Sequence, residues 1–260
     1  MSEKSSEKVI LEKIKKVARI TLNNGELNLF DKKQVVEFRD ALSNVKNDPK
    51  IRALLIQANG RAFSAGFHLK EMTNDESILH IFRDVGKEFI KLLYRMTIPT
   101  ISLIHNYAIG IACLVAFASD FRFVLKDVAF CLPEINYSFM FPTHGGMTIT
   151  PKICRSDSDA KYILMTGEHI KWELADKMGL VTKTFETKEE MEKEGLEFAT
   201  TLSKKNPATM SMIKACFEKC KNISLEEGMI IEKEAEEINT SIKAEREIGI
   251  EKFIDKHQLK

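Results

Sequence analysis

The sequence predicts an α/β domain built mainly on a parallel sheet. Its 260 residues are 44% hydrophobic, which is enough apolar material to bury a large core in one domain. Short apolar segments alternate with longer segments whose apolar residues recur every three to four positions. Because strands that alternate with helices form βαβ units, this order of segments predicts parallel pairing. No internal repeat or low-complexity linker divides the chain.

The N-terminal segment predicts two short strands and a helix. Apolar and charged residues alternate from Val9 to Leu22, and a break at Lys15–Lys16 divides the segment into two antiparallel strands. Asp31 is suited to cap a helix, because apolar residues follow it at helical spacing. These apolar residues are Val35, Phe38, Leu42 and Val45. Asp48–Pro49 ends this helix, and residues 51–57 predict a buried strand.

The middle of the chain continues the alternation. A long amphipathic helix is predicted from Ile78, and Pro99 ends it. The apolar face of this helix consists of Ile78, Phe82, Val85, Phe89, Leu92 and Met96. Strands are predicted at residues 100–104, 121–125 and 128–132, and a buried helix at 110–118. Asp120 is expected to order the backbone where that helix meets the next strand.

Helices are predicted to dominate beyond Gly145. Thr187 with Glu190, and Ser224 with Glu227, form two capping boxes, each at the start of a helix. An apolar stripe then continues to about residue 257, through Ile230, Ile231, Ile238, Ile242, Ile248 and Phe253. The charge around it is dense and mixed, which excludes a membrane helix and indicates packing on the domain or on a partner subunit.

Composition and charge exclude several classes of partner. Lys and Arg number 39 and Asp and Glu 38, so the charge gives no indication of a nucleic-acid partner. No apolar segment approaches the ~20 residues that span a bilayer, and the N-terminal residues lack the apolar part of a secretory signal. The five cysteines form no CxxC pair and no ligand-like spacing, which indicates reduced, buried thiols. We expect a cytoplasmic protein with no membrane partner.

One carboxylate stands beside two turns that contain glycine. FSAG at residues 63–66 is followed by an apolar segment in which Gly110 precedes a helix, and Glu134 comes directly after Pro133. A strand that ends in a tight turn and the start of a helix both expose backbone N–H groups, which can hold a developing oxyanion. A neighbouring carboxylate can move a proton. The combination predicts chemistry on a carbonyl compound through an enolate.

These residues resemble the crotonase superfamily, the enoyl-CoA hydratase/isomerase group, from about Val9 to Lys205. Seven segments carry the resemblance in the right order and at compatible spacing. They are RALLI at 52–56, FSAG at 63–66, PT at 99–100, the helix from Gly110 to Asp120, PEI at 133–135, TGEHI at 166–170 and ADKMGLV at 175–181.

The resemblance implies a fold, a substrate and a set of binding residues. The fold is a crotonase-like spiral of ββα units over residues 1–200, with a helical region at 201–260 that supports trimers or dimers of trimers and closes the pocket. The substrate is an acyl-CoA thioester, with no metal and no cofactor beyond the CoA moiety of the substrate. The thioester oxygen would be held by the backbone N–H groups of Phe67 and Ile111. Six residues around these donors are implied to bind substrate: Ser64, Ala65, Gly66, His68, Leu69 and Gly110.

A departure from the family pattern at Leu114 predicts the reaction type. Two-carboxylate hydratases of the family have a glutamate there and a second one at the position of Glu134. Hydration divides water activation and proton delivery between the two, whereas moving a double bond needs one base. A leucine with one glutamate is also the pattern of the monofunctional isomerases. We therefore predict a Δ3-Δ2 enoyl-CoA isomerase with Glu134 as the acid/base. A hydratase, an acyl-CoA hydrolase or an inactive CoA-binding scaffold are alternatives, because one fold hosts many reactions.

An apolar acyl pocket is expected around Glu134. Leu114, Phe139 and Phe141 would line it and raise the pKa of the carboxyl by desolvation, with Tyr137 as a further aromatic of the wall. The loop from Glu134 to Gly145 is one residue longer than is typical.

Four other positions carry open alternatives. His68 stands where the family often has aspartate, and it either forms a structural hydrogen bond or contacts substrate. Ile111 stands in place of a glycine, and its β-branched side chain could misplace its own N–H. His144 is expected to support the helix start or to face solvent, and the alternative is a second acid/base or a contact with substrate. Lys252 and Lys256 either are solvated or reach CoA phosphates.

Overall fold

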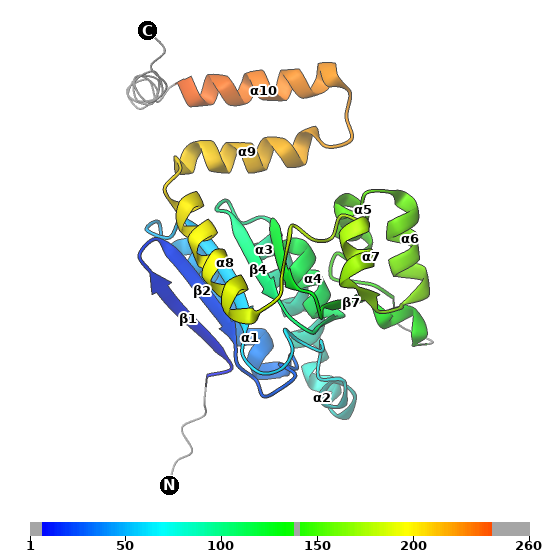
Figure 1. Cartoon of the computed structure of the whole chain (residues 1–260). Coiled ribbons are helices and arrows are strands. Elements are labelled where there is room, and N and C mark those ends of the chain that lie inside the picture. Colours follow the sequence, from blue (N-terminus) through cyan, green and yellow to red (C-terminus); the bar gives the residue numbers. More distant parts are fainter. Residues whose placement is uncertain (1–6, 138–140, 241–260) are drawn as a thin grey trace. The chain divides into compact units, whose positions relative to one another are not determined.

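The computed structural model describes residues 7–137 and 141–240 (Figure 1). The chain divides into two compact units, Met1–Lys204 and Lys205–Lys260. The first unit holds two sheets and helices α1 to α8, and the second holds α9 (Pro207–Cys220) and α10 (Leu225–Thr240).

A six-stranded sheet forms the centre of the first unit. Its strands, in order across the sheet, are β1 (Val9–Ile14), β2 (Val17–Leu22), β3 (Ala53–Ala58), β4 (Thr100–Ile104), β6 (Phe121–Leu125) and β9 (Lys183–Phe185). β1 and β2 are antiparallel, and Lys15 between them has a φ of +58°. Every later pair in this sheet is parallel, as the alternation of segments predicts.

The first unit also contains a second sheet, which has three strands. It consists of β5 (Tyr107–Ile109), β7 (Ala129–Cys131) and β8 (Ile170–Lys171), with β5 and β7 parallel and β7 and β8 antiparallel. The predicted strand at 128–132 is confirmed in a shorter form. Because β5 continues directly from β4 through His105 and Asn106, the chain passes from one sheet to the other just before Gly110.

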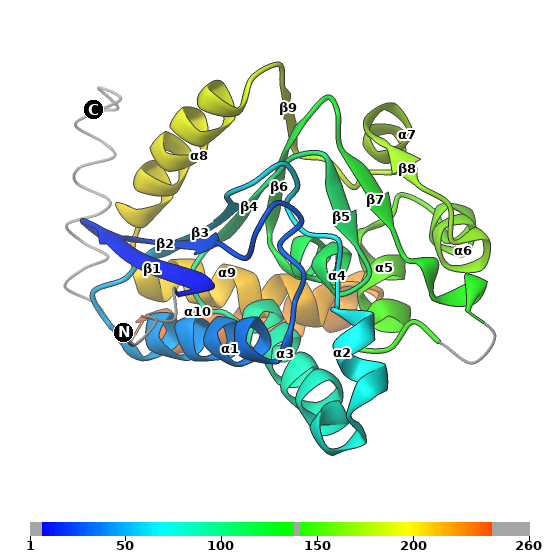
Figure 2. The same cartoon turned by 90° about the horizontal axis from the view of Figure 1, so that it is seen from below.

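Helices cover both faces of the large sheet. α8 (Lys188–Ser203) lies on one face, and α1 (Lys32–Asn47) and α3 (Gly86–Tyr94) lie on the other (Figures 1 and 2). Alternate residues of β3 divide between two cores: Leu55 packs in the smaller one with residues of α8, and Leu54 packs in the larger one. α4 (Ile111–Ala118) is buried along its whole length, as predicted.

The predicted helix ends are confirmed by their hydrogen bonds. The Asp31 side chain accepts a bond of 2.9 Å from the Gln34 N–H, and Thr187 caps α8 through the Glu190 N–H. Asp120 accepts bonds from both the N–H and the hydroxyl of Thr100, at 2.8 and 2.9 Å, which orders the junction after α4.

The long helix predicted from Ile78 to Met96 is confirmed as a helical segment that ends at Tyr94, but it is not α-helical throughout. The segment contains a 3₁₀ turn, η1 (Glu76–Ile78), a π turn, η2 (Ile81–Val85), and then α3. Its apolar face is as predicted, because Phe82 and Phe89 are fully buried. The remaining elements of the first unit are α2 (Leu69–Asn74), η3 (Pro133–Asn136), α5 (Gly146–Ile153), α6 (Asp157–Thr166) and α7 (Trp172–Lys177).

The second unit is a helical hairpin. Asn206 caps α9, and Ser224 and Glu227 form the predicted capping box at the start of α10 through reciprocal bonds of 3.3 and 3.1 Å. Five apolar residues of this unit are strongly exposed: Ile213, Phe217, Leu225, Met229 and Ile230. The predicted stripe beyond residue 240 lies outside the described residues. Within residues 7–137 and 141–240, no helix has the length and apolar character needed to cross a membrane.

Candidate active site

Two segments of the first unit meet where the chain leaves the large sheet. Ser64 pairs with Ala108 in a parallel bridge: its N–H donates to the Tyr107 carbonyl at 2.9 Å, and its carbonyl accepts from the Ile109 N–H at 3.1 Å. Gly66 follows with a φ of +91°, and a Cβ there would lie 2.8 Å from the Ile109 carbonyl oxygen. Only glycine therefore permits this approach.

The backbone on both sides of Phe67 is held by hydrogen bonds, while its own N–H is left free. The Phe30 N–H donates to the Gly66 carbonyl at 2.8 Å, and the His68 N–H donates to the Phe30 carbonyl at 3.0 Å. Among the described residues no acceptor receives the Phe67 N–H. The Ser64 hydroxyl adds support from inside the turn, donating to the Asn28 carbonyl at 2.7 Å and accepting from the Gly66 N–H at 3.1 Å.

Gly110 supplies the second turn. It has a φ of +55°, its N–H donates to the Cys131 carbonyl at 2.8 Å, and α4 begins at the next residue, Ile111. Because the positive φ falls on Gly110, the β-branched side chain of Ile111 stands at a helical position. The Ile111 N–H belongs to the first turn of α4, where backbone donors have no partner within the helix.

The Glu134 carboxyl lies against this second turn. It stands in η3, and its Oε1 is 3.8 Å from the position that a Cβ would take on Gly110. Its Oε2 is buried and forms no hydrogen bond with the described residues. Burial raises the pKa of Glu134 above the ordinary value of 4.5. The carboxyl is thus available for proton transfer beside the start of α4.

The position of α4 at which a hydratase would have its second carboxylate holds an apolar side chain. Leu114 is 2% exposed, and its Cδ2 lies 3.8 Å from the position of a Cβ on Gly146, at the start of α5. The aromatic residues predicted for the pocket wall remain a prediction. Tyr137 and Phe141 are 44% and 62% exposed in the chain, and Phe139 lies outside the described residues.

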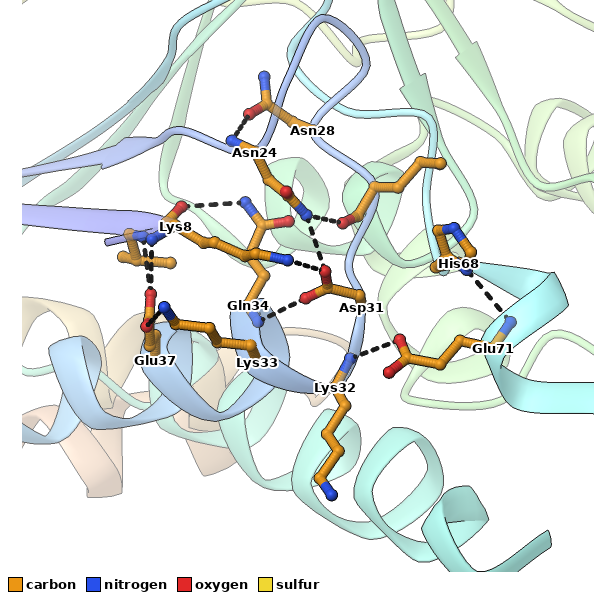
Figure 3. Close-up of polar contacts among 12 residues, drawn as sticks. Lys8, Asn24, Asn28, Asp31, Lys32, Lys33, Gln34, Glu37, His68 and Glu71 are labelled. Atoms are coloured by element: carbon orange, nitrogen blue, oxygen red, sulfur yellow. Dashed lines mark hydrogen bonds and ion pairs between the residues drawn. The ribbon is translucent and has the colours of Figure 1, made fainter. Parts of the chain in front are cut away.

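His68 makes a structural hydrogen bond at the start of α2. Its Nδ1 accepts from the Glu71 N–H at 3.1 Å, and the Glu71 carboxylate in turn accepts from the Lys32 N–H at 3.0 Å (Figure 3). This chain of contacts ties the segment after Phe67 to the first turn of α1. Leu69 of the same segment is 41% exposed, and Ala65 is held by a bond from its N–H to the Leu27 carbonyl at 2.9 Å.

A cavity of about 500 Å³ opens beside His68. Lys32, His68, Lys70, Glu71, Asp75 and Ile78 line it. Neither lysine was identified from the sequence. The signal for Lys70 was its place four residues after the FSAG segment. Lys32 comes from the distant start of α1, where its N–H donates to Glu71.

His144 is placed differently from the prediction that it supports the helix start or faces solvent. Its Nε2 lies 3.0 Å from the Phe82 carbonyl oxygen, and α5 receives no capping bond from a side chain at its N-terminus. Lys252 and Lys256 lie outside the described residues.

Comparisons with known proteins identify similar chains. The family model described as enoyl-CoA hydratase/isomerase matches residues 12–260. A crotonyl-CoA hydratase from Syntrophomonas wolfei is 27% identical over 255 residues, which cover 97% of this chain and 96% of that protein. A carnitinyl-CoA dehydratase from Salmonella typhi is 27% identical over 224 residues, which cover 86% and 85%.

Solved structures show the same fold. DspI from Pseudomonas aeruginosa has a TM-score of 0.87 at 23% identity and covers 98% of both chains. An enoyl-CoA hydratase from Bacillus anthracis has a TM-score of 0.84 at 23% identity and covers 96% of both chains. At these identities the likeness establishes the fold, and it confirms the fold predicted from the sequence.

Proposed function

The chain belongs to the enoyl-CoA hydratase/isomerase family, and we propose that it moves a proton on an acyl-CoA thioester through an enolate. The observation that carries this proposal is the Oε2 atom of Glu134, which is buried beside Gly110 and has no hydrogen-bond partner among the described residues. That oxygen has no hydrogen bond to break before it takes a proton. Its raised pKa also makes it a stronger base than an exposed glutamate.

The backbone supplies the complementary charge stabilisation. The N–H groups of Phe67 and Ile111 stand on segments that Ser64, Gly66 and Ile109 hold side by side. Two donors of this kind stabilise the negative charge that develops on the thioester oxygen when the neighbouring carbon loses a proton. Removing one such donor commonly costs ~2.7–4 kcal/mol in the transition state.

The finer proposal is a Δ3-Δ2 enoyl-CoA isomerase. The Glu134 carboxylate would take a proton from C2, the electrons of that C–H bond would extend the enolate through the C3–C4 double bond, and the protonated carboxyl would return a proton to C4. The double bond then lies between C2 and C3. Leu114 supports this reaction, because one carboxylate and an aliphatic neighbour suffice for a proton shuttle and give water no second activating group.

Hydration of a 2-enoyl-CoA is the second candidate, and the names of the relatives favour it over isomerisation. The similar proteins are named hydratase and dehydratase, and they match most of the chain at 27% identity. Leu114 argues against this reaction, since water activation and proton delivery would both fall to Glu134.

Lys32 and Lys70 suit the CoA part of the substrate. Both line the cavity beside His68, next to the segment that carries the Phe67 N–H. Two ammonium groups there would attract phosphate groups of CoA. The proposed chemistry needs no cofactor beyond the CoA moiety itself.

Product analysis tests these proposals. A 3-enoyl-CoA and a 2-trans-enoyl-CoA are supplied separately to the wild type, to Glu134→Gln and to Glu173→Gln, which changes an exposed glutamate of α7. Conversion of the 3-enoyl-CoA to the 2-trans product, lost in Glu134→Gln alone, supports the isomerase. Water addition to the 2-enoyl-CoA as the faster reaction supports the hydratase. Rates equal to buffer for all three proteins would reject both enzymes and favour an inactive CoA-binding protein.

A further inference from the structure

A π turn places one backbone carbonyl of the segment before α3 in contact with a histidine. In the π turn at Ile81–Val85 the helix is wider than an α-helix, and the regular hydrogen-bond pattern is interrupted. The Phe82 carbonyl oxygen lies 3.0 Å from His144 Nε2. A carbonyl oxygen only accepts, so this contact places the imidazole hydrogen on Nε2. On the other side of the ring, the Thr143 hydroxyl lies 2.7 Å from Nδ1 and can donate to it.

The same imidazole packs on the residue whose N–H is the proposed oxyanion donor. The rings of His144 and Phe67 are 5.5 Å apart, and the rings of Phe67 and Phe82 are 5.4 Å apart, both edge to face. The Phe67 side chain therefore packs on both the histidine and the π turn. These two ring contacts restrict its position.

Gly86 gives these rings the room they occupy. A Cβ on Gly86 would lie 3.0 Å from Cδ2 and Nε2 of His144 and 3.2 Å from Cζ of Phe67. Both separations are tighter than an ordinary van der Waals contact, so any larger residue would push the rings aside. Gly86 has ordinary helical angles, φ −58° and ψ −45°, so its backbone does not require glycine. The glycine instead leaves space for the rings of His144 and Phe67.

The backbone of His144 is in a strained conformation. It has a φ of +53°, in the left-handed region that residues other than glycine seldom adopt. Such strain persists where surrounding contacts hold it. Gly145 follows with a φ of +93° and begins the approach to α5. The bond to Phe82 and the packing on Phe67 help to hold this turn, together with the bond from the Gly146 N–H to the Thr143 carbonyl at 2.8 Å.

We propose that His144 is a positioning residue, which holds the Phe67 ring and so aims the Phe67 N–H at the thioester oxygen. This inference rests on the proposed function, because it assumes that the Phe67 N–H is an oxyanion donor. Burial lowers the pKa of His144, which favours the neutral ring that donates through Nε2 at neutral pH. His144 does not contact the reacting atoms in this proposal, and it acts through Phe67.

Two substitutions at His144 separate the hydrogen bond from the packing. His144→Phe keeps a ring and removes the donor, whereas His144→Gln keeps an N–H₂ group that can reach the Phe82 carbonyl. Neither residue favours a positive φ, so both variants carry the same backbone strain. We expect His144→Phe to lower kcat roughly tenfold to hundredfold with KM nearly unchanged, because a small misplacement of a catalytic group costs rate and not affinity. His144→Gln should recover most of the lost kcat.

Gly86→Ala disturbs the same ring contact by adding a methyl group on α3. Alanine gains helix propensity over glycine, which partly offsets the larger cost of displacing the two rings with its Cβ. We expect a lower kcat with a small decrease in Tm. His80→Phe is the matched control, since His80 is exposed on the same segment and its Nδ1 contacts only the local Ser77 carbonyl. It should match the wild type.

The outcomes distinguish this inference from the proposed function. Equal kcat values for the wild type, His144→Phe and Gly86→Ala overturn the positioning role, and so does an equal loss in His144→Phe and His144→Gln. If wild type and Glu134→Gln are equally inactive, the proposed function fails instead. Amide hydrogen exchange then still tests the contact: faster exchange at residues 81–86 in His144→Phe, but not in His80→Phe, supports it, and unchanged exchange overturns it.

Discussion

At the scale of single residues, the Glu134 carboxyl shows how a reactive group is kept at a cost in stability. A buried carboxyl without a hydrogen bond is unfavourable, above all when it is ionised. The fold keeps it in the 3₁₀ turn that begins at Pro133, close to Gly110. A buried oxygen that served only the fold would have a partner, so the absence of one for Oε2 among the described residues fits a chemical role.

Glu134→Gln is predicted to stabilise the protein at neutral and alkaline pH. Burial raises the folded-state pKa above 4.5, so the folded protein holds this proton more tightly than the unfolded chain. The resulting stabilisation is fully present below the ordinary pKa and is lost as pH rises through the raised one. Glutamine never ionises, so the Tm of Glu134→Gln should exceed that of the wild type by a few degrees at pH 8. For a chain of this size, 1 kcal/mol of stability corresponds to roughly 2–4 °C in Tm.

Thermal unfolding at pH 4 and pH 8 measures this effect. The difference in Tm between Glu134→Gln and the wild type should narrow toward pH 4. There the native carboxyl is protonated, so it is uncharged like the glutamine side chain. Glu173→Gln, an exposed change of the same chemistry, should follow the wild type at both values. A Glu134→Gln protein that is less stable than the wild type at pH 8 would show that the carboxylate has a stabilising partner.

Leu114→Glu is predicted to shift the reaction toward hydration. The new carboxyl would stand on the buried face of α4, at the position where hydratases of the family have their other glutamate. We expect the ratio of water addition to isomerisation to rise tenfold or more, with a stability cost of about 1–3 kcal/mol for the buried polar group. Leu114→Gln is the uncharged control, and an equal ratio in both variants would remove Leu114 as the determinant of reaction type.

The sequence identified some residues of the site, and tertiary contacts in the structure identified its other features. The motif residues Gly66, Gly110 and Glu134 were identified from their order in the sequence. The free oxygen of Glu134 and the cavity lysines depend on tertiary contacts between segments that are far apart in the chain. No local pattern could show them, because what matters is the absence or presence of a partner from another element.

At the scale of elements, the site depends on the close approach of two backbones. Gly66 and Ile109 stand on segments that are joined by the bridge between Ser64 and Ala108. The approach aligns the turn that carries the Phe67 N–H with the strand that leads to Gly110.

Gly66→Ala is predicted to damage both stability and catalysis. Alanine at a φ of +91° is strained by about 1–3 kcal/mol, and its Cβ would stand 2.8 Å from the Ile109 carbonyl oxygen. Displacing the Phe67 N–H should also lower kcat by roughly 10²–10³-fold, the effect of losing one oxyanion donor. Denaturant unfolding and steady-state kinetics measure the two effects.

Gly228→Ala is the control for this substitution. A Cβ on Gly228 of α10 would have no atom within 4 Å, so the change should leave kcat unaltered. Wild-type activity in Gly66→Ala would mean that the approach of Gly66 to Ile109 is not needed for the reaction.

Element types were predicted well wherever local chemistry decides them. The caps at Asp31 and Thr187 follow from side chains that bond to nearby N–H groups, and the parallel strands follow from continuous apolar runs. The π turn at Ile81–Val85 could not be predicted, because the apolar spacing there also fits an α-helix. Phe82 of this turn contacts His144, which is 62 residues away in the sequence.

At the scale of the whole molecule, the apolar surface of the second unit needs an explanation. Ile213 and Phe217 stand four residues apart on α9, so they share one face of the helix, and they are 58% and 67% exposed. Leu225, Met229 and Ile230 of α10 are also strongly exposed. Exposed large apolar residues on two helices that contact each other are typical of a surface that binds another protein. We propose that they contact other copies of the chain in a trimer or a dimer of trimers.

Phe217→Glu is predicted to dissociate this assembly. Light scattering should give the wild type a mass of three or six times the 29.7 kDa of the chain, and the variant a smaller one, because a charge would be buried without a partner at the contact. Ala215→Glu adds the same charge on α9 at an exposed position that does not share a face with Phe217, so it should keep the wild-type mass. A wild type that is monomeric, or a Phe217→Glu protein that keeps the full mass, would locate any self-association elsewhere. If Phe217→Glu dissociates and also loses activity while Ala215→Glu does neither, the active site depends on the assembled form.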